Sequence, residues 1–240
     1  MDYLWRWSDK RMKVGFLGGA FNPPHRAHVL LGEKALSYYA LDRLVYIPTH
    51  IPPHKKIVDG WDDQIRLLLI SLAIFAWKTE KVGGYIKRFS FPEEETAQFL
   101  NLYDSLYSKY HKDFIEVSDY EITSYGVSYT INTVKYFLGK NPDWKIHIII
   151  GMDQAAVLDT WKDYDELSRV AKFCVAERDG FDPDMIKNKF PFIDIFPFPS
   201  INISSSQIRR LLHEGKDIRE MVPDIIVAFI DLLKSYQKNN

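Results

Sequence analysis

The sequence predicts an α/β fold built on a doubly wound parallel sheet with helices on both faces. Apolar strand-like runs alternate with helical patterns along the 240 residues, as in parallel strands joined by crossover helices. The run 145–150 is almost continuous in branched aliphatic side chains, which indicates a central strand covered on both faces. The run 12–17 ends in a glycine turn that leads directly into a helical pattern.

Each element can be placed in order. Strands are expected at 12–17, 43–48, 114–122, 145–150, 172–177 and 192–196. Helices are expected at 62–77, at 128–139 with Ser128 opening and Gly139 closing the pattern, at 205–214, and from Pro223 onward. Residues 93–111 repeat apolar side chains at the spacing of one helix face, which predicts an inserted helix or helical hairpin packed on the core.

Composition restricts the class of protein. The net charge of −1 argues against a nucleic-acid partner, and no apolar stretch approaches the roughly 20 residues that a membrane span needs. The single cysteine, Cys174, cannot form an internal disulfide, which fits a reducing cytoplasm. We expect one domain over 1–240, with a tryptophan-containing extension at 1–11 packed on its surface, an insertion at about 78–115 and a C-terminal helical part at 200–240.

The most informative segment is GGAFNPPHRAH at 18–28. The pair Gly18 and Gly19 lets the backbone approach a bulky anion, and the N-terminus of the next helix points to the same place. His25 and His28, at the mouth of that helix, can donate to phosphate oxygens. Two chance surface histidines are the alternative, and a zinc site is disfavoured because no cysteine or carboxylate stands at ligand spacing.

The chemistry that fits this segment is the in-line attack of a phosphate oxygen on the α-phosphorus of a nucleoside triphosphate. Such a transfer needs alignment and charge neutralisation more than a covalent catalyst. A dinucleotide-binding oxidoreductase is disfavoured, because the first turn reads GFLGG and not GxGxxG.

The segment resembles the glycine-rich HxGH motif of the nucleotidyltransferase superfamily, most closely that of nicotinate-nucleotide adenylyltransferases. ISSSQIR at 203–209 is similar to their second signature, ISSTxxR. Five further pieces follow in family order: IPTHIPPHKK (47–56), VSYTINT (127–133), IIIGMDQ (148–154), DTWKDYDEL (159–167) and VAERDGF (175–181). The resemblance implies a Rossmann-like fold and the transfer of AMP from ATP to nicotinate mononucleotide, in NAD biosynthesis, with release of pyrophosphate and with Mg²⁺ accompanying the ATP.

The resemblance assigns one set of residues to ATP. The histidines His25 and His28 would act at the reacting phosphate. Lys55 would contact the triphosphate, and Arg209 would hold the leaving pyrophosphate together with the N-terminus of the helix at 205–214. The expected catalytic residues are therefore His25, His28, Lys55 and Arg209. The expected ATP-binding set is Gly18, Gly19, Ala20, Phe21, His25, His28, Gly151, Asp153, Ser204, Ser205 and Arg209.

Three of these assignments carry alternatives. Ser204 and Ser205 could be no more than N-caps of the helix at 205–214, and one of them could be an N-cap as well as a phosphate contact. The loop 51–56 follows a strand and would face the ligand crevice at its carboxyl end, where Lys56 could share or take the role of Lys55, unless both are solvated lysines on a proline-stiffened loop. Gly151 permits close approach of a ribose or adenine. The carboxylate of Asp153 can accept from ribose hydroxyls, or it could only cap the next helix.

A second set concerns the acceptor. By resemblance, Trp161 stacks on the pyridine ring, although it could be an ordinary core aromatic. The backbone amides of Thr130 or Ile131, and that of Lys162, would meet the nicotinate carboxylate. Amide donors suit a carboxylate, so the acid is expected to be preferred over the amide. The expected nicotinate-nucleotide-binding set is Asn22, Tyr129, Thr130, Ile131, Trp161 and Lys162, and no metal held by the protein itself is expected.

The sequence departs from the family pattern at several positions. Asn22 and Ala27 stand where aspartate and glycine are frequent in bacterial members. Glu177 and Asp179 alter the basic piece around Arg178. A non-catalytic nucleotide-binding relative therefore stays an alternative, as does an enzyme for nicotinamide mononucleotide or for both mononucleotides. The pieces SYT (128–130) and TWKDY (160–164) disfavour phosphopantetheine as the acceptor.

Overall fold

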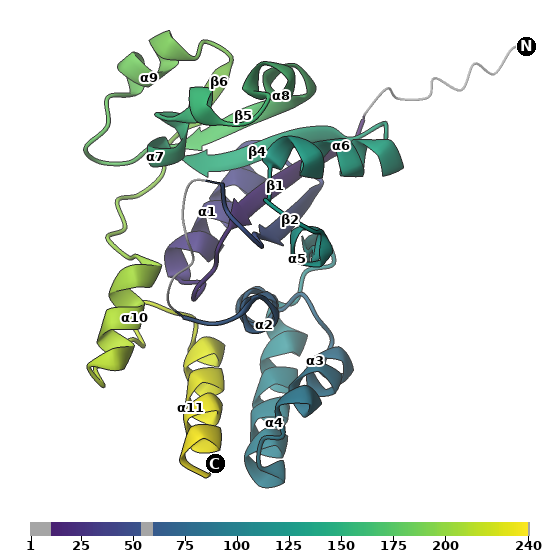
Figure 1. The fold of residues 1–240 in the computed structure, drawn as a ribbon, viewed down its shortest axis with the longest axis vertical. Helices are drawn as coiled ribbons and strands as arrows, with labels where there is room; N and C mark the ends of the chain where they lie inside the picture. The colour runs from purple at the N-terminus through teal and green to yellow at the C-terminus, as the bar shows by residue number, and fades with distance from the viewer. Residues whose placement is uncertain (1–10, 54–59, 240) are drawn as a thin grey trace, which may run out of the picture.

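The structure, a computed structural model, describes residues 11–53 and 60–239. The predictions for the tryptophan-containing N-terminal segment and for Lys55 and Lys56 therefore lie outside the described residues. Within them, six parallel strands form one sheet in the order β3-β2-β1-β4-β5-β6 (Figure 1). The strands are β1 (Lys13–Gly19), β2 (Arg43–Pro48), β3 (Ile115–Val117), β4 (Lys145–Gly151), β5 (Ala171–Ala176) and β6 (Ile193–Phe196).

The strand order reverses in the middle of the sheet. β1 pairs with β2 on one side and with β4 on the other, and all pairs are parallel. The loops that leave β1 and β4 consequently diverge and leave a crevice at the carboxyl ends of the strands, where open α/β sheets bind their ligands. This arrangement confirms the predicted doubly wound fold.

Helices cover both faces of the sheet. One layer consists of α1 (Arg26–Tyr38), α2 (Asp63–Ala73), α3 (Thr79–Ile86), α4 (Glu93–Tyr110), α10 (Ser205–His213) and α11 (Asp224–Asn239). The opposite layer consists of α6 (Thr130–Lys140), α7 (Met152–Ala155), α8 (Tyr164–Val170) and α9 (Pro183–Lys189). Strand residues alternate between the two cores: Ile148 and Ile150 pack with the second layer, whereas Ile149 packs with the first.

The segment after α2 is helical, as expected for 93–111. α3, the short helix η1 (Lys87–Phe89) and α4 extend below the sheet, where α4 lies beside α11 and α3 packs on α4 (Figure 1). The Tyr103 side chain of α4 is fully buried and donates its hydroxyl to the Trp77 carbonyl at 2.6 Å, while Phe99 meets Phe229 of α11 with ring centroids 5.6 Å apart. The predicted helix packed on the core is confirmed. That it is an insertion, and the domain division as a whole, stay predictions.

Three element boundaries differ from the sequence-based expectation. The strand predicted at 114–122 ends at Val117, and α5 (Tyr120–Thr123) follows it. The helix predicted at 62–77 ends at Ala73, because Phe75 adopts a left-handed backbone with φ of 51°. The helix predicted at 128–139 runs from Thr130 to Lys140, with the Ser128 hydroxyl accepting from the His50 amide at 3.1 Å instead of capping the helix.

Candidate active site

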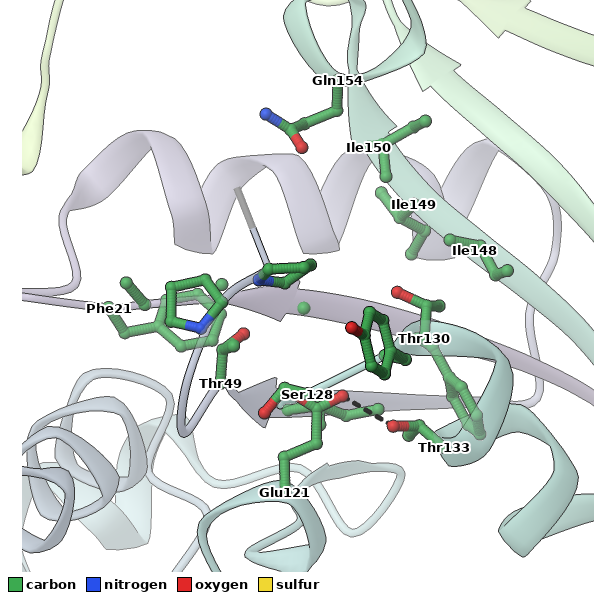
Figure 2. A pocket seen from close by; sticks show the side chains of 18 of the residues that line it. Phe21, Thr49, Glu121, Ser128, Thr130, Thr133, Ile148, Ile149, Ile150 and Gln154 are labelled. Carbon is green, nitrogen blue, oxygen red and sulfur yellow. Dashed lines mark hydrogen bonds between the residues drawn. The ribbon is translucent and has the colours of Figure 1, made fainter. Parts of the chain in front are cut away.

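A pocket of about 560 Å³ lies at the carboxyl ends of β1, β2 and β4, where the strand order reverses (Figure 2). Gly18 and Gly19 line it from β1, Thr49 from the end of β2, and Ile150 from β4. Its volume is in the range of small-molecule and cofactor sites. The twelve predicted residues on its wall are Gly18, Gly19, Ala20, Phe21, Asn22, His28, Tyr129, Thr130, Trp161, Lys162, Ser205 and Arg209.

The turn after β1 presents the histidine pair. Phe21 has a left-handed backbone with φ of 46°, and its buried ring packs edge-to-face on His28 at a centroid distance of 5.1 Å. His25 is the N-cap residue of α1, and its ring stacks on that of His28 with centroids 3.7 Å apart. His28 lines the pocket, whereas His25 lies behind it and is only 6% exposed.

The hydrogen bond between these residues decides which ring nitrogen of His28 can donate. The backbone amide of His25 donates to Nδ1 of His28 at 3.2 Å. A ring nitrogen that accepts carries no proton, so the proton of the neutral ring resides on Nε2. His28 therefore offers an Nε2–H group as its donor.

Burial keeps both rings neutral in the free protein. It lowers the pKa of His25 from 6.5 to about 4. Burial also lowers the pKa of His28 well below its usual value, and the neighbouring His25 lowers it further. Near neutral pH the pair consists of uncharged donors. An approaching phosphate favours the protonated form and raises both pKa values.

The second signature docks directly on this turn. The Arg209 guanidinium donates to the Asn22 carbonyl at 2.7 Å, across 187 residues of sequence, and the Ser205 hydroxyl donates to the Pro23 carbonyl at 2.9 Å. Ser204 does not line the pocket. Its hydroxyl accepts from the Gln207 amide at 3.2 Å, which makes it the N-cap of α10. The N-terminus of α10 thus faces the same pocket as the histidine turn.

The opposite side of the pocket carries the aromatic residues. Tyr129, the N-cap residue of α6, and Trp161 both line it. The Trp161 ring packs edge-to-face on Phe173, and its Nε1 is buried without a hydrogen-bond partner in the described structure. The Lys162 ammonium lies 4.6 Å from the Tyr129 ring centroid, a cation–π distance.

Several predicted site residues do not line the pocket. Besides His25 and Ser204 these are Ile131, which is 1% exposed in the core of the second layer, and the pair Gly151 and Asp153 at the end of β4. Asp153 forms an ion pair with Arg178 at 3.5 Å, so these two residues neutralise each other at the pocket's edge. For the five predicted residues that do not line the pocket, contact with a ligand stays a prediction.

The sequence analysis missed Arg66. This residue of α2 is fully buried, and its guanidinium donates to the carbonyls of Ala20 at 2.6 Å and Thr49 at 2.7 Å, with Asp63 as its ion-pair partner. It therefore ties the end of β1 to the end of β2 beneath the pocket. The sequence gives no signal for this role, because Arg66 follows Asp63 and Gln64 near the start of the helix, where a charged side chain is expected to face water.

Two features are absent from the described residues. None of the helices there has the length and hydropathy needed to cross a membrane. No group of three or more His, Cys, Asp or Glu side chains in the same part of the chain is placed to hold a metal ion.

A family model described as cytidylyltransferase-like matches residues 16–211. The chain belongs to this family. Among its relatives, a protein of Clostridium botulinum (strain Hall) is 31% identical over 223 residues, which covers 89% of this chain and 94% of the relative. One from Clostridium tetani is 29% identical, covering 88% and 92%. Both are named "Probable nicotinate-nucleotide adenylyltransferase". The predicted membership in that family of nucleotidyltransferases is confirmed.

Solved structures share the fold. A nicotinic acid mononucleotide adenylyltransferase of Plasmodium falciparum, in complex with NaAD, superposes with a TM-score of 0.68 at 17% identity, covering 94% of this chain and 98% of the other. The same enzyme in complex with APC gives a TM-score of 0.67 at the same identity and coverage. Because of the low identity, these likenesses support the Rossmann-like fold and not the roles of individual residues.

Proposed function

We propose that this protein is a nicotinate mononucleotide adenylyltransferase, which transfers AMP from ATP to nicotinate mononucleotide and releases pyrophosphate in NAD biosynthesis. The observation that carries the proposal is the contact of the two remote signatures, Arg209 to the Asn22 carbonyl, on a pocket whose other side holds Tyr129 and Trp161. A phosphate-binding half and an aromatic half are what this pair of substrates requires. The names of the relatives support the same pair.

In the proposed reaction, a phosphate oxygen of the mononucleotide attacks the α-phosphorus of ATP. The bond from the α-phosphorus to the bridging oxygen breaks, and pyrophosphate leaves with that oxygen. His28 donates from Nε2 to an oxygen of the reacting phosphate, where negative charge builds up. Arg209 and the free amides at the start of α10, beside Ser205, hold the β- and γ-phosphates. Lys55 is retained as a proposed triphosphate contact.

Magnesium enters this proposal as a companion of ATP. The polar side chains of the pocket include the His28 imidazole, several hydroxyls and the cationic groups of Lys162 and Arg209, with Glu121 as the carboxylate on its wall. This donor set fits a cation carried mainly by phosphate oxygens, which are the hard ligands Mg²⁺ prefers. We also retain a cytoplasmic location as part of the proposal, which the single, buried Cys174 supports.

A single assay tests the proposal. The purified protein is given MgATP with nicotinate mononucleotide or with nicotinamide mononucleotide, and pyrophosphate release is followed. An unpaired donor facing the NH₂ of the amide costs about 1–3 kcal/mol, so we expect a specificity constant at least about tenfold higher for the acid. Equal rates would favour a dual-specificity enzyme. No release with either mononucleotide would favour a non-catalytic nucleotide-binding relative, for which the Ala27 departure was noted above.

A further inference from the structure

A buried carboxylate stands in the wall of the pocket. Glu121 of α5 lines the pocket but is only 8% exposed. Burying a carboxylate costs free energy of desolvation unless hydrogen bonds to its oxygens compensate for the lost water. The Thr133 hydroxyl donates to it at 2.6 Å, and the hydroxyls of Ser128 and Thr49 lie close enough to Glu121 to lower its pKa. Figure 2 shows these side chains gathered around Glu121, with the Thr133 bond drawn as a dashed line.

The three hydroxyls come from two segments far apart in the sequence. Thr49 directly follows β2, whereas Ser128 and Thr133 bracket the start of α6. The same two segments are joined by their backbones, because the Ser128 amide donates to the Ile51 carbonyl at 2.9 Å. The Ser128 hydroxyl accepts from the His50 amide, so its one proton is free to go to Glu121. Glu121 therefore joins the end of β2 to the N-terminus of α6.

The start of α6 lies between Ser128, which precedes the helix, and Thr133 in its first turn. Tyr129 is its N-cap residue, and the first amides of a helix have no partner within the helix. In the proposed function, the amide of Thr130 or Ile131 receives the nicotinate carboxylate. Ser128 and Thr133 lie on either side of these amides, so any rotation of the helix start moves their hydroxyls away from Glu121.

Burial and hydrogen bonding act on this carboxylate in opposite directions. Burial raises the pKa of Glu121 above its usual value, while the three hydroxyl donors lower it. The hydroxyl dipoles thus favour the charged form of Glu121 and compensate for part of its desolvation. Thr133, Ser128 and Thr49 all lie outside the histidine turn and outside α10.

We propose that Glu121 is a positioning residue for the acceptor half of the pocket. Its carboxylate holds Ser128 and Thr133 and thereby orients the first amides of α6 toward the carboxylate of the pyridine mononucleotide. This inference rests on the proposed function, and it gives Glu121 no contact with either substrate. It predicts that loss of the carboxylate weakens acceptor binding and leaves ATP binding unchanged.

Steady-state kinetics separate an effect on the binding of the mononucleotide from an effect on the binding of ATP. Glu121→Gln keeps the shape but replaces one acceptor oxygen by a donor, so we expect the KM for nicotinate mononucleotide to rise about tenfold while the KM for ATP stays unchanged. Thr133→Val should act in the same direction, and Thr133→Ser, which keeps the hydroxyl, should behave as the wild type. Glu116→Gln is the matched control, because Glu116 on β3 forms an ion pair with Arg43 on β2 and does not line the pocket.

Amide hydrogen exchange provides a readout that needs no turnover. Glu121→Gln should speed exchange of the Asn132 and Thr133 amides, which donate to the Tyr129 carbonyl in the first turn of α6, by about tenfold in the free protein, and Glu116→Gln should not. A wild-type protein that releases no pyrophosphate refutes the proposed function, while the exchange data still decide whether Glu121 orders this helix start. An active wild type whose Glu121→Gln form changes neither KM nor exchange overturns the positioning role. Equal rises in both KM values also overturn it, since they indicate a general structural role.

Discussion

Substitution of His28 tests the phosphate half of the site most directly. His28→Ala removes the Nε2–H donor, and one preorganised donor at the position of developing charge is worth about 3 kcal/mol, so turnover should fall at least about a hundredfold. The same change also removes Nδ1 as the acceptor for the His25 amide at 3.2 Å. Loss of such a capping contact costs about 1 kcal/mol of stability, which must be measured separately.

A second variant separates the donor from the ring. The amide nitrogen of glutamine reaches approximately where Nε2 of histidine lies, so His28→Gln keeps a donor but cannot gain the proton that a phosphate would draw to the imidazole. We expect its turnover to lie between those of the wild type and His28→Ala. The donor geometry assigned here, with Nδ1 accepting and Nε2 donating, requires this order.

The assay is the initial rate of pyrophosphate release at saturating MgATP and nicotinate mononucleotide, together with urea unfolding of each variant. His213→Ala serves as the control, because His213 is exposed in the last turn of α10. A correctly folded His28→Ala protein with wild-type turnover would refute the role of this histidine in phosphoryl transfer. Equal loss in the Ala and Gln variants would show that a hydrogen-bond donor at Nε2 is not sufficient.

Three other perturbations have defined outcomes. Arg209→Ala should raise the KM for ATP more than that for the mononucleotide, because its fork is placed for the pyrophosphate; equal effects in steady-state kinetics would indicate a structural arginine. Trp161→Ala should weaken both mononucleotides in titration calorimetry and leave ATP affinity unchanged, since only the pyridine ring stacks there; weakened ATP binding would contradict this. Arg66→Met should lower the free energy of unfolding by at least about 2 kcal/mol, because two carbonyls lose their donor; the exposed Arg210→Met is the control in urea unfolding.

The pH dependence of stability follows from the histidine turn. The pKa of His25 is lowered from 6.5 to about 4 on folding, so the unfolded chain binds more protons between these values. Stability that is present above 6.5 is lost as the pH falls toward 4, and at about pH 5 the loss from this group alone is about 2 kcal/mol. Urea unfolding midpoints of the wild type and of His25→Gln, measured at about pH 7 and at about pH 5, test this prediction. If the midpoint of the wild type falls no more steeply with pH than that of the variant, the lowered pKa of His25 is contradicted.

Hydrophobic patterning located the strands because each face of the sheet is covered by its own helical layer. The run 145–150 illustrates this: its branched side chains alternate between two cores, and the pattern leaves no room for an exposed face. Patterning failed at 114–122, where alternating apolar residues resemble a strand. There the chain leaves the sheet after Val117 and turns into α5, which buries Ile122 and Glu121 together. Only tertiary contacts explain that turn.

The site was predictable where backbone geometry imposes residue types. The glycine pair stands out by local spacing, the two signatures are identified by their resemblance to those of nicotinate-nucleotide adenylyltransferases, and the structure brings both signatures to one pocket. Arg66 and Glu121 could not be found in this way. A charged side chain within an amphipathic segment normally faces water, and nothing in the order of the residues indicates that these two are buried. Their partners are backbone carbonyls and hydroxyls from other elements, which only the folded chain assembles.

These two buried charges act on opposite sides of the same junction. Arg66 donates to the carbonyl of Thr49, and the Thr49 hydroxyl lies near Glu121 and lowers its pKa, so a single residue after β2 has a cation at its backbone and an anion near its side chain. Arg66 also reaches the phosphate turn at Ala20, while Glu121 reaches the start of α6. The phosphate half and the acceptor half of the pocket are therefore joined at Thr49. Since a transfer reaction needs its two substrates aligned within a fraction of an ångström, a rigid junction between the two half-sites favours the in-line geometry that the proposed reaction requires.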